Sequence, residues 1–89
     1  DAPKVTRITV TPDARLMTFR ETQKLAVTAH FSDGSKQDVT RLAQFSSSES
    51  VYAAVNADGL VTAGPIPGEA AIMARYAEKF AVSSVLVPR

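Results

Sequence analysis

Short alternating segments recur along this chain, and they constrain its fold more than any other feature. In the segment VTRITVT (5–11), Ile8 and Val10 share one face of an extended strand while polar residues occupy the other. In KLAVTAHF (24–31), apolar residues recur at every second position. Turn-forming residues separate such segments at intervals of roughly 8–12 residues, a spacing typical of an all-β sandwich or barrel.

Two tight turns are marked by their residue types. Asp33-Gly34 directly follows segment 24–31, and an Asp-Gly pair between alternating runs is a strong hairpin signal. Residues 56–59 (NADG) predict a type I turn in which Gly59 takes the left-handed conformation. A Cβ atom at position 59 would cost about 1–2 kcal/mol. We therefore interpret this tight reversal as a device that builds the fold.

The remaining segments complete an all-β pattern. Only residues 39–45 have the composition for a turn or so of helix, and they are too short for more. A last hairpin turns across Ala77-Glu78. The further predicted strands are 38–40, 44–48, 52–55, 60–63, 69–76 and 80–87.

Length and composition limit the classes of function. The 89 residues suit one small domain, residues 1–89. Ten Lys and Arg stand against nine Asp and Glu, for a net charge of +1, and the basic residues are scattered, so a nucleic-acid partner is not expected. No apolar run approaches the roughly 18 residues of a membrane span, so membrane insertion is not expected either. There is no cysteine, and the chain starts at Asp1 without an initiator Met. We expect it to be excised from a longer multidomain protein.

The middle and end of the chain carry a set of motifs in a fixed order. Asp38-Val39-Thr40 precedes Phe45 with three serines, and residues 52–55 (YAAV) and 59–63 (GLVTA) follow. Gly68 then opens residues 70–74 (AAIMA), while residues 8–12 (ITVTP) and 19–25 (FRETQKL) lie upstream. In order and spacing, these blocks resemble the bacterial immunoglobulin-like domain, group 2. The resemblance covers nearly the whole chain.

The resemblance implies an all-β, immunoglobulin-like β-sandwich of about seven strands in two sheets. It also implies a module of bacterial surface or other extracytoplasmic proteins, without catalytic residues or a cofactor. Three positions depart from the family pattern: Phe45 stands where Trp is usual, Arg20 replaces a Gly, and Glu49-Ser50 replaces an Asn/Asp-Pro pair. A Phe fills the same core slot with less volume.

The candidates for chemistry are few. His30 is the only histidine, lies on the expected outer face of its strand and has no His or Cys partner, so we interpret it as a solvated strand residue. The serines lack a G-x-S-x-G elbow, and an enzyme is not expected.

Some bacterial immunoglobulin-like modules bind calcium between domains, and clustered carboxylates are its ligands. Turn chemistry explains Asp33 and Asp58 equally well. The carboxylates considered for calcium are Asp33, Asp38, Glu49 and Asp58.

Two features are candidates for recognition. If Ile72 and Val85 point inward, apolar residues of the last hairpin fall on the outer face, either as edge packing or as a seam against a neighbouring domain. The phase of residues 80–87 is ambiguous, because one of two adjacent serines lies inside in either phase. The loop GPIPG (64–68) either binds a ligand or stiffens a crossing between sheets. The candidate interaction surface comprises Pro65, Ile66, Pro67, Met73, Tyr76, Phe80, Val82 and Leu86.

Two functions follow as hypotheses. The first is a non-catalytic spacer or domain-docking module whose partners are neighbouring domains of the same polypeptide. The alternative is an adhesive module that contacts a protein or polysaccharide, with an aromatic platform resting on Tyr76 and Phe80. The predicted core is Ile8, Val10, Met17, Phe19, Leu25, Val27, Ala29, Phe45, Val55, Leu60, Ile72, Val85 and Val87.

Overall fold

The computed structural model describes residues 2–89, and within them it contains strands and turns but no helix. It accordingly shows no helix of the length and hydropathy that crossing a membrane requires in that range. The strands are β1 (Val5–Thr11), β2 (Ala14–Leu16), β3 (Thr22–Lys24), β4 (Ala26–Phe31), β5 (Lys36–Asp38), β6 (Gln44–Ser47), β7 (Ala53–Val55), β8 (Leu60–Ala63), β9 (Gly68–Tyr76) and β10 (Lys79–Val87).

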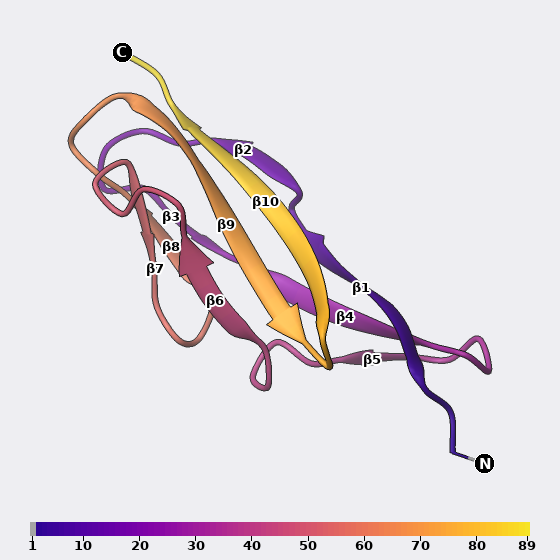
Figure 1. Cartoon of the computed structure of the whole chain (residues 1–89). Helices are drawn as coiled ribbons and strands as arrows, with labels where there is room; N and C mark the ends of the chain where they lie inside the picture. Colours follow the sequence, from indigo (N-terminus) through magenta and orange to yellow (C-terminus); the bar gives the residue numbers. More distant parts are fainter. Residues whose placement is uncertain (1) are drawn as a thin grey trace.

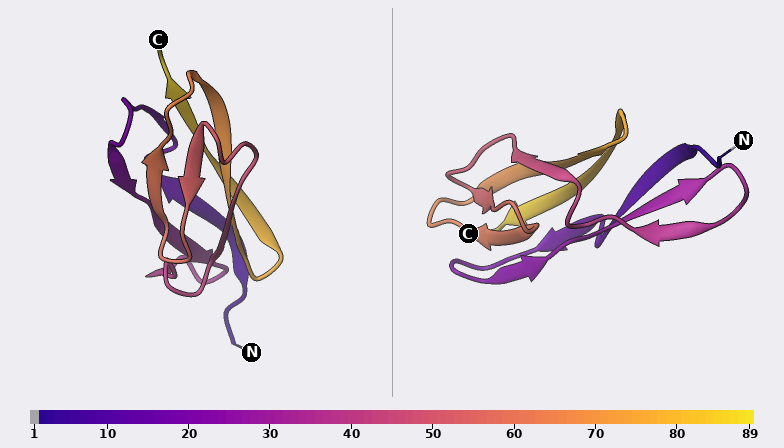
Figure 2. Two further views of the ribbon diagram at one scale, coloured as in Figure 1. Left: turned by 90° about the vertical axis from the view of Figure 1, so that its left-hand side faces the viewer. Right: turned by 90° about the horizontal axis from the view of Figure 1, so that it is seen from below.

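The strands form a two-layered sandwich. One layer is a four-stranded sheet in the order β2-β10-β9-β6. The other combines the sheets β1-β4-β5 and β3-β8-β7, which adjoin because only Leu25 separates β3 from β4. Figure 1 shows the long β9–β10 hairpin in front of β4, and Figure 2 shows it diverging from the β1–β4–β5 sheet at its turn. The all-β immunoglobulin-like sandwich predicted from the sequence is confirmed.

The ten strands exceed the expected number of about seven: eight strand segments were predicted along the sequence, one of them is divided in two, and one short strand was missed. The predicted strand 24–31 begins at Thr22 and is divided at Leu25, whose N–H donates to the carbonyl of Gly59 at 2.8 Å. Strand β2 has three residues and follows Pro12, which disguised it in the sequence. It runs parallel to β10, a pairing that local patterns do not reveal.

The chain changes layers between β1 and β2. Strand β1 pairs antiparallel with β4 in one layer, and β2 then pairs with β10 in the other. The buried hydroxyl of Ser83 donates to the carbonyl of Pro12 at 2.7 Å, and the N–H of Ser84 donates to the carbonyl of Asp13 at 2.9 Å. These bonds settle the phase of β10: Ser83 points into the core and Ser84 does not.

The core between the layers largely matches the prediction. Nine predicted residues are buried, while Phe45 and Val55 are partly buried and pack against the core. The prediction that Phe19 belongs to the core is wrong, because this residue is 54% exposed. It lies in a turn where the guanidinium of Arg20 is 5.0 Å from the centre of its ring. The core prediction for Leu60 is also wrong, because the alternation of β8 runs opposite to the predicted one and Val61 is the buried residue. The buried residues predicted correctly are Ile8, Val10, Met17, Leu25, Val27, Ala29, Ile72, Val85 and Val87.

The predicted turn at residues 56–59 is confirmed. Gly59 has a φ of 82°, and its N–H donates to the carbonyl of Asn56 at 3.0 Å. The side-chain carbonyl of Asn56 accepts from the N–H groups of Asp58 and Leu60. The hairpin at Asp33-Gly34 also forms, joining β4 to β5, and Gly34 has a φ of 88°.

Candidate interaction surface

The outward side of the β2-β10-β9-β6 sheet carries a row of exposed apolar side chains. Along β10, inward residues such as Val85 are buried, while the intervening Phe80, Val82 and Leu86 are exposed. Val82 lies opposite Met73 of β9, which is also exposed. We name this surface the outer face: Leu16, Met73, Phe80, Val82 and Leu86.

Sequence reasoning missed one member of the outer face. Leu16 pairs with Leu86 across the parallel β2–β10 ladder and is 63% exposed. The alternation of Leu16 with the predicted core residue Met17 was the signal available, but it became informative only with the β2–β10 pairing. At the other end of the face, the guanidinium of Arg75 lies 5.9 Å from the ring centre of Phe80. The face is therefore apolar along β10, with charge at its margin.

The other predicted surface residues lie apart from the outer face. Tyr76 is half-buried and packs against the core, so it does not form a platform with Phe80. Pro65, Ile66 and Pro67 are exposed in the loop before β9. Since Gly68 pairs with Val87, this loop lies at the end from which the C-terminus emerges (Figure 1). The structure thus places the predicted residues in an outer face, an end loop and a core contact.

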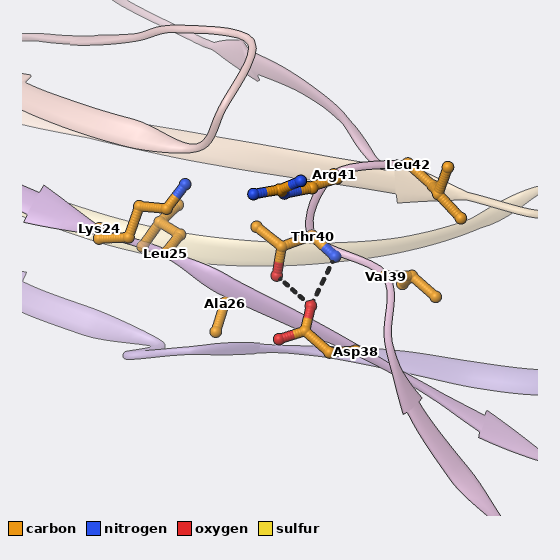
Figure 3. Close-up of a pocket in the computed structure, with 8 residues that line it drawn as sticks. All are labelled: Lys24, Leu25, Ala26, Asp38, Val39, Thr40, Arg41 and Leu42. Carbon is orange, nitrogen blue, oxygen red and sulfur yellow. Dashed lines mark hydrogen bonds between the residues drawn. The ribbon is translucent and has the colours of Figure 1, made fainter.

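A separate pocket of about 500 Å³ lies where β3 passes into β4 and β5 ends. Figure 3 shows the amine of Lys24 and the guanidinium of Arg41 pointing toward one another above Thr40 and Asp38. The amine of Lys24 also donates to the main-chain carbonyl of Asp58. The amine of Lys24 therefore ties this side of the pocket to the turn before β8.

Asp38 and Thr40 form a local network beneath this pocket. One carboxylate oxygen of Asp38 accepts from the N–H and the hydroxyl of Thr40, at 2.8 and 2.7 Å. These two bonds hold the pKa of Asp38 below its ordinary value of 3.8. The Thr40 oxygen in turn accepts from the buried N–H of Val27 at 2.8 Å. The motif DVT therefore fastens the end of β5 to β4.

The carboxylates considered for calcium have structural partners or lie apart. Asp33 accepts from the N–H and hydroxyl of Ser35, which lowers its pKa, as expected for a turn. Asp58 lies in the turn before β8 and Glu49 before β7. Residues 2–89 contain no group of three or more His, Cys, Asp or Glu side chains that is arranged to hold a metal ion.

His30 is half-buried in the middle of a sheet rather than fully solvated. Its Nε2 lies 3.0 Å from the hydroxyl of Thr9. Arg7 of β1 and Lys36 of β5 are its register partners on either side. Desolvation, followed by the charges of Arg7 and Lys36, lowers the pKa of His30 below its ordinary value of 6.5. The imidazole is therefore neutral near pH 7.

The fold and these surfaces define a small immunoglobulin-like module with an apolar side and charged turns. The family model described as bacterial Ig-like domain (group 2) matches residues 4–79. The chain therefore belongs to that family, and the resemblance seen in its motifs is confirmed.

Individual relatives share the fold or part of the sequence. Ice-binding protein 1 of Shewanella frigidimarina (strain NCIMB 400) is 39% identical over 70 residues, which make up 79% of this chain and 8% of that protein. The chain therefore spans less than a tenth of this relative. A structure of domains 5–6 of the S-layer protein SbsC superposes with a TM-score of 0.77 at 19% identity, over 97% of this chain and 45% of that one.

A second structure, of domains 1–6 of the surface layer protein SbsC, gives a TM-score of 0.79 at 19% identity, over 98% of this chain and 13% of that one. At such identities the likeness shows the fold alone. The family match and these structures therefore agree on the kind of module and on its fold.

Proposed function

We propose that this chain is a non-catalytic spacer of an extracytoplasmic or surface protein, which holds neighbouring domains at a fixed separation. The observation that carries the proposal is the position of the termini. The body measures 50 × 18 × 16 Å, and the chain enters at one end of it and leaves at the other (Figures 1 and 2). Domains joined at the two ends are therefore held apart along the long axis.

Stiffness supports the same proposal. Nine-residue strands β9 and β10 pair along their whole length and traverse much of the body. Within residues 2–89, every buried side-chain nitrogen or oxygen has a hydrogen-bond partner. Closely packed sheets with satisfied polar groups open only at a substantial free-energy cost. The module is thus suited to transmit a fixed geometry between its ends.

The end loop and the outer face support a docking role within this function. Pro65 and Pro67 fix two φ angles in the exposed loop beside the C-terminal exit. A following domain meets this loop first. Leu16 and Leu86 of the outer face lie near the same exit, and a neighbouring domain packed there would cover them.

The adhesive hypothesis has less support. Sugars stack on exposed aromatic faces, and Tyr76 contributes to the core instead. Phe80 then remains as the one exposed ring of the predicted platform, with Arg75 beside it, while the exposed ring of Phe19 lies in the turn between β2 and β3. The name of the ice-binding relative belongs to a protein of which this chain matches only 8%, so it does not decide the ligand of this module.

A distance measurement between two spin labels tests the spacer function. Because the chain contains no cysteine, Lys4→Cys with Glu69→Cys gives two unique labelling sites. Both residues are exposed, and both are anchored: Lys4 bonds to Ser32, and Glu69 lies in the β9–β10 ladder toward the other end. We expect one narrow distance distribution, which becomes broad in denaturing urea.

A broad or multiple distribution in the native protein would exclude a rigid spacer. Lys4→Cys with Ser32→Cys is the control pair, because these neighbours lie within one hydrogen-bonded contact. A narrow control distribution beside a broad end-to-end distribution would locate the motion inside the module rather than in the labels.

A further inference from the structure

Strand β10 is paired along only part of one edge. Its entire length pairs with β9 on one side. On the other side, β2 pairs only with residues Ser84, Val85 and Leu86. Figure 1 shows β2 beside the C-terminal part of β10, while β1 leaves toward the other layer. Residues 79–83 therefore form an open edge.

Two residues direct their main-chain groups toward this open edge. The N–H of Ser84 and the carbonyl of Leu86 bond to the chain around β2, so the even-numbered residues of this strand face that side. Antiparallel strands alternate in this way, so Phe80 and Val82 direct their N–H and C=O groups there as well. No main-chain group within residues 2–89 pairs with either residue on this side.

The open edge has little of the usual protection against pairing. Natural sheets guard exposed edges with charged side chains, proline or bulges. The edge strand β5 of the other layer is of this kind, with exposed Lys36 and Asp38. By contrast, the open edge (residues 79–83, KFAVS) contains no proline, and its one charge, Lys79, stands at the end next to the turn. Phe80 and Val82 are also 58% and 48% exposed.

There is space beside the edge. A cleft of about 540 Å³ lies between β10 and the chain that passes from β1 to β2. Its walls include Thr9, Thr11 and Pro12 on one side and Phe80 and Val82 on the other. A further strand lies about 4.8 Å from its neighbour, and the cleft opens along the segment where such a strand would run.

We propose that a second copy of this chain pairs antiparallel along the open edge of β10 through its own β10. The segment is self-complementary, because each copy offers the same N–H and C=O groups across a two-fold axis. The open residues nearest that axis, 80–83, carry no charge, so identical charges do not face each other there. Pairing also brings the exposed Phe80 and Val82 of the two copies together.

The available surface predicts a weak association. A stable dimer typically buries about 800 Å² on each partner, and an exposed edge of five residues with two large side chains offers less. Copies held side by side at high local concentration therefore pair, while dilute copies remain monomeric. The interface depends on main-chain hydrogen bonds more than on apolar area.

Sedimentation equilibrium over a range of protein concentrations, with a Val82→Pro variant, tests this proposal. Proline removes the N–H of Val82, which faces the open edge and not β9, so the strand tolerates it. By symmetry one substitution removes two intermolecular bonds, and we expect the dimer to dissociate about tenfold more readily or more. Val82→Ala is the matched control, because it trims the side chain and retains the N–H.

The proposal is overturned if the native chain stays monomeric at about 1 mM, a concentration where weak pairing is detectable. It is also overturned if Val82→Ala weakens the dimer as much as Val82→Pro, since loss of side-chain contacts alone would then explain the weakening.

Amide hydrogen exchange in the native sequence gives an independent measurement if the proline variant does not fold. Exchange at Phe80 and Val82 must slow as concentration rises, whereas Ala81 and Ser83, bonded to β9, must not change. Equal rates at all concentrations contradict strand pairing.

Discussion

At the scale of single residues, Gly34 and Gly59 hold the backbone at positive φ in two turns, but their surroundings differ. A Cβ at Gly34 meets nothing within 4 Å, whereas at Gly59 it lies 2.9 Å from the ring of Phe45. We expect Gly34→Ala to cost about 1 kcal/mol from backbone strain alone. Gly59→Ala must cost more, about 2–3 kcal/mol, because the ring has to move as well. Urea unfolding of both variants measures the difference, and equal losses would show that Phe45 adjusts freely.

His30 makes the stability of this module depend on pH. Its pKa is lowered in the folded chain, so the unfolded chain binds more protons in the interval below 6.5. Its contribution to stability is therefore fully present above the unfolded pKa and is lost as pH falls through the folded pKa. We expect the melting temperature of the native chain to fall as pH drops from 7 through the ordinary pKa of histidine, and the melting temperature of His30→Gln to fall less. Parallel curves for the two proteins would show that neither desolvation nor the charges of Arg7 and Lys36 lower the pKa of this imidazole.

At the scale of elements, the β9–β10 hairpin turns through residues that disfavour its geometry. Ala77 and Glu78 have φ values of 52° and 65°, the sign pattern of a type I′ turn, which Asn-Gly suits best. We expect Ala77→Asn with Glu78→Gly to stabilise the chain by about 1 kcal/mol or more. Thermal unfolding measures the gain. Glu78→Gln is the control, since it removes the charge but not the strain, and a similar gain in both would refute the backbone explanation.

Elements were predictable where their pattern is local. Strand β1 has the predicted bounds, and the turn at Gly59 forms because its four residues specify it. Strand β2 was not predictable, because its partner β10 lies about 70 positions away and the parallel ladder spans only three residues. Arg20 illustrates the same limit: its φ of 69° lies in the left-handed region that favours Gly, yet Phe19 beside it turns outward against expectation.

The candidate surface was predictable to a similar extent. With Val85 inward, alternation along residues 80–87 predicted Phe80, Val82 and Leu86 outside, with Met73 opposite, but the two adjacent serines left that phase open. Tyr76 has the same phase along β9 as the buried Ile72 and Ala74, and this is why it packs against the core instead of beside Phe80. The open edge had no signal in the sequence, since it exists only where β2 ends before β10 does.

At the scale of the whole molecule, the two ends and the open edge of β10 face different directions. The termini lie at the two ends of a body 50 Å long, so the proposed spacer would carry neighbouring domains along its axis. Residues 79–83 lie on its flank, so a second copy approaches from the side. Axial connection and lateral pairing therefore do not compete for the same residues. Since each lateral contact is weak, its effect grows with the number of modules that one chain places in line.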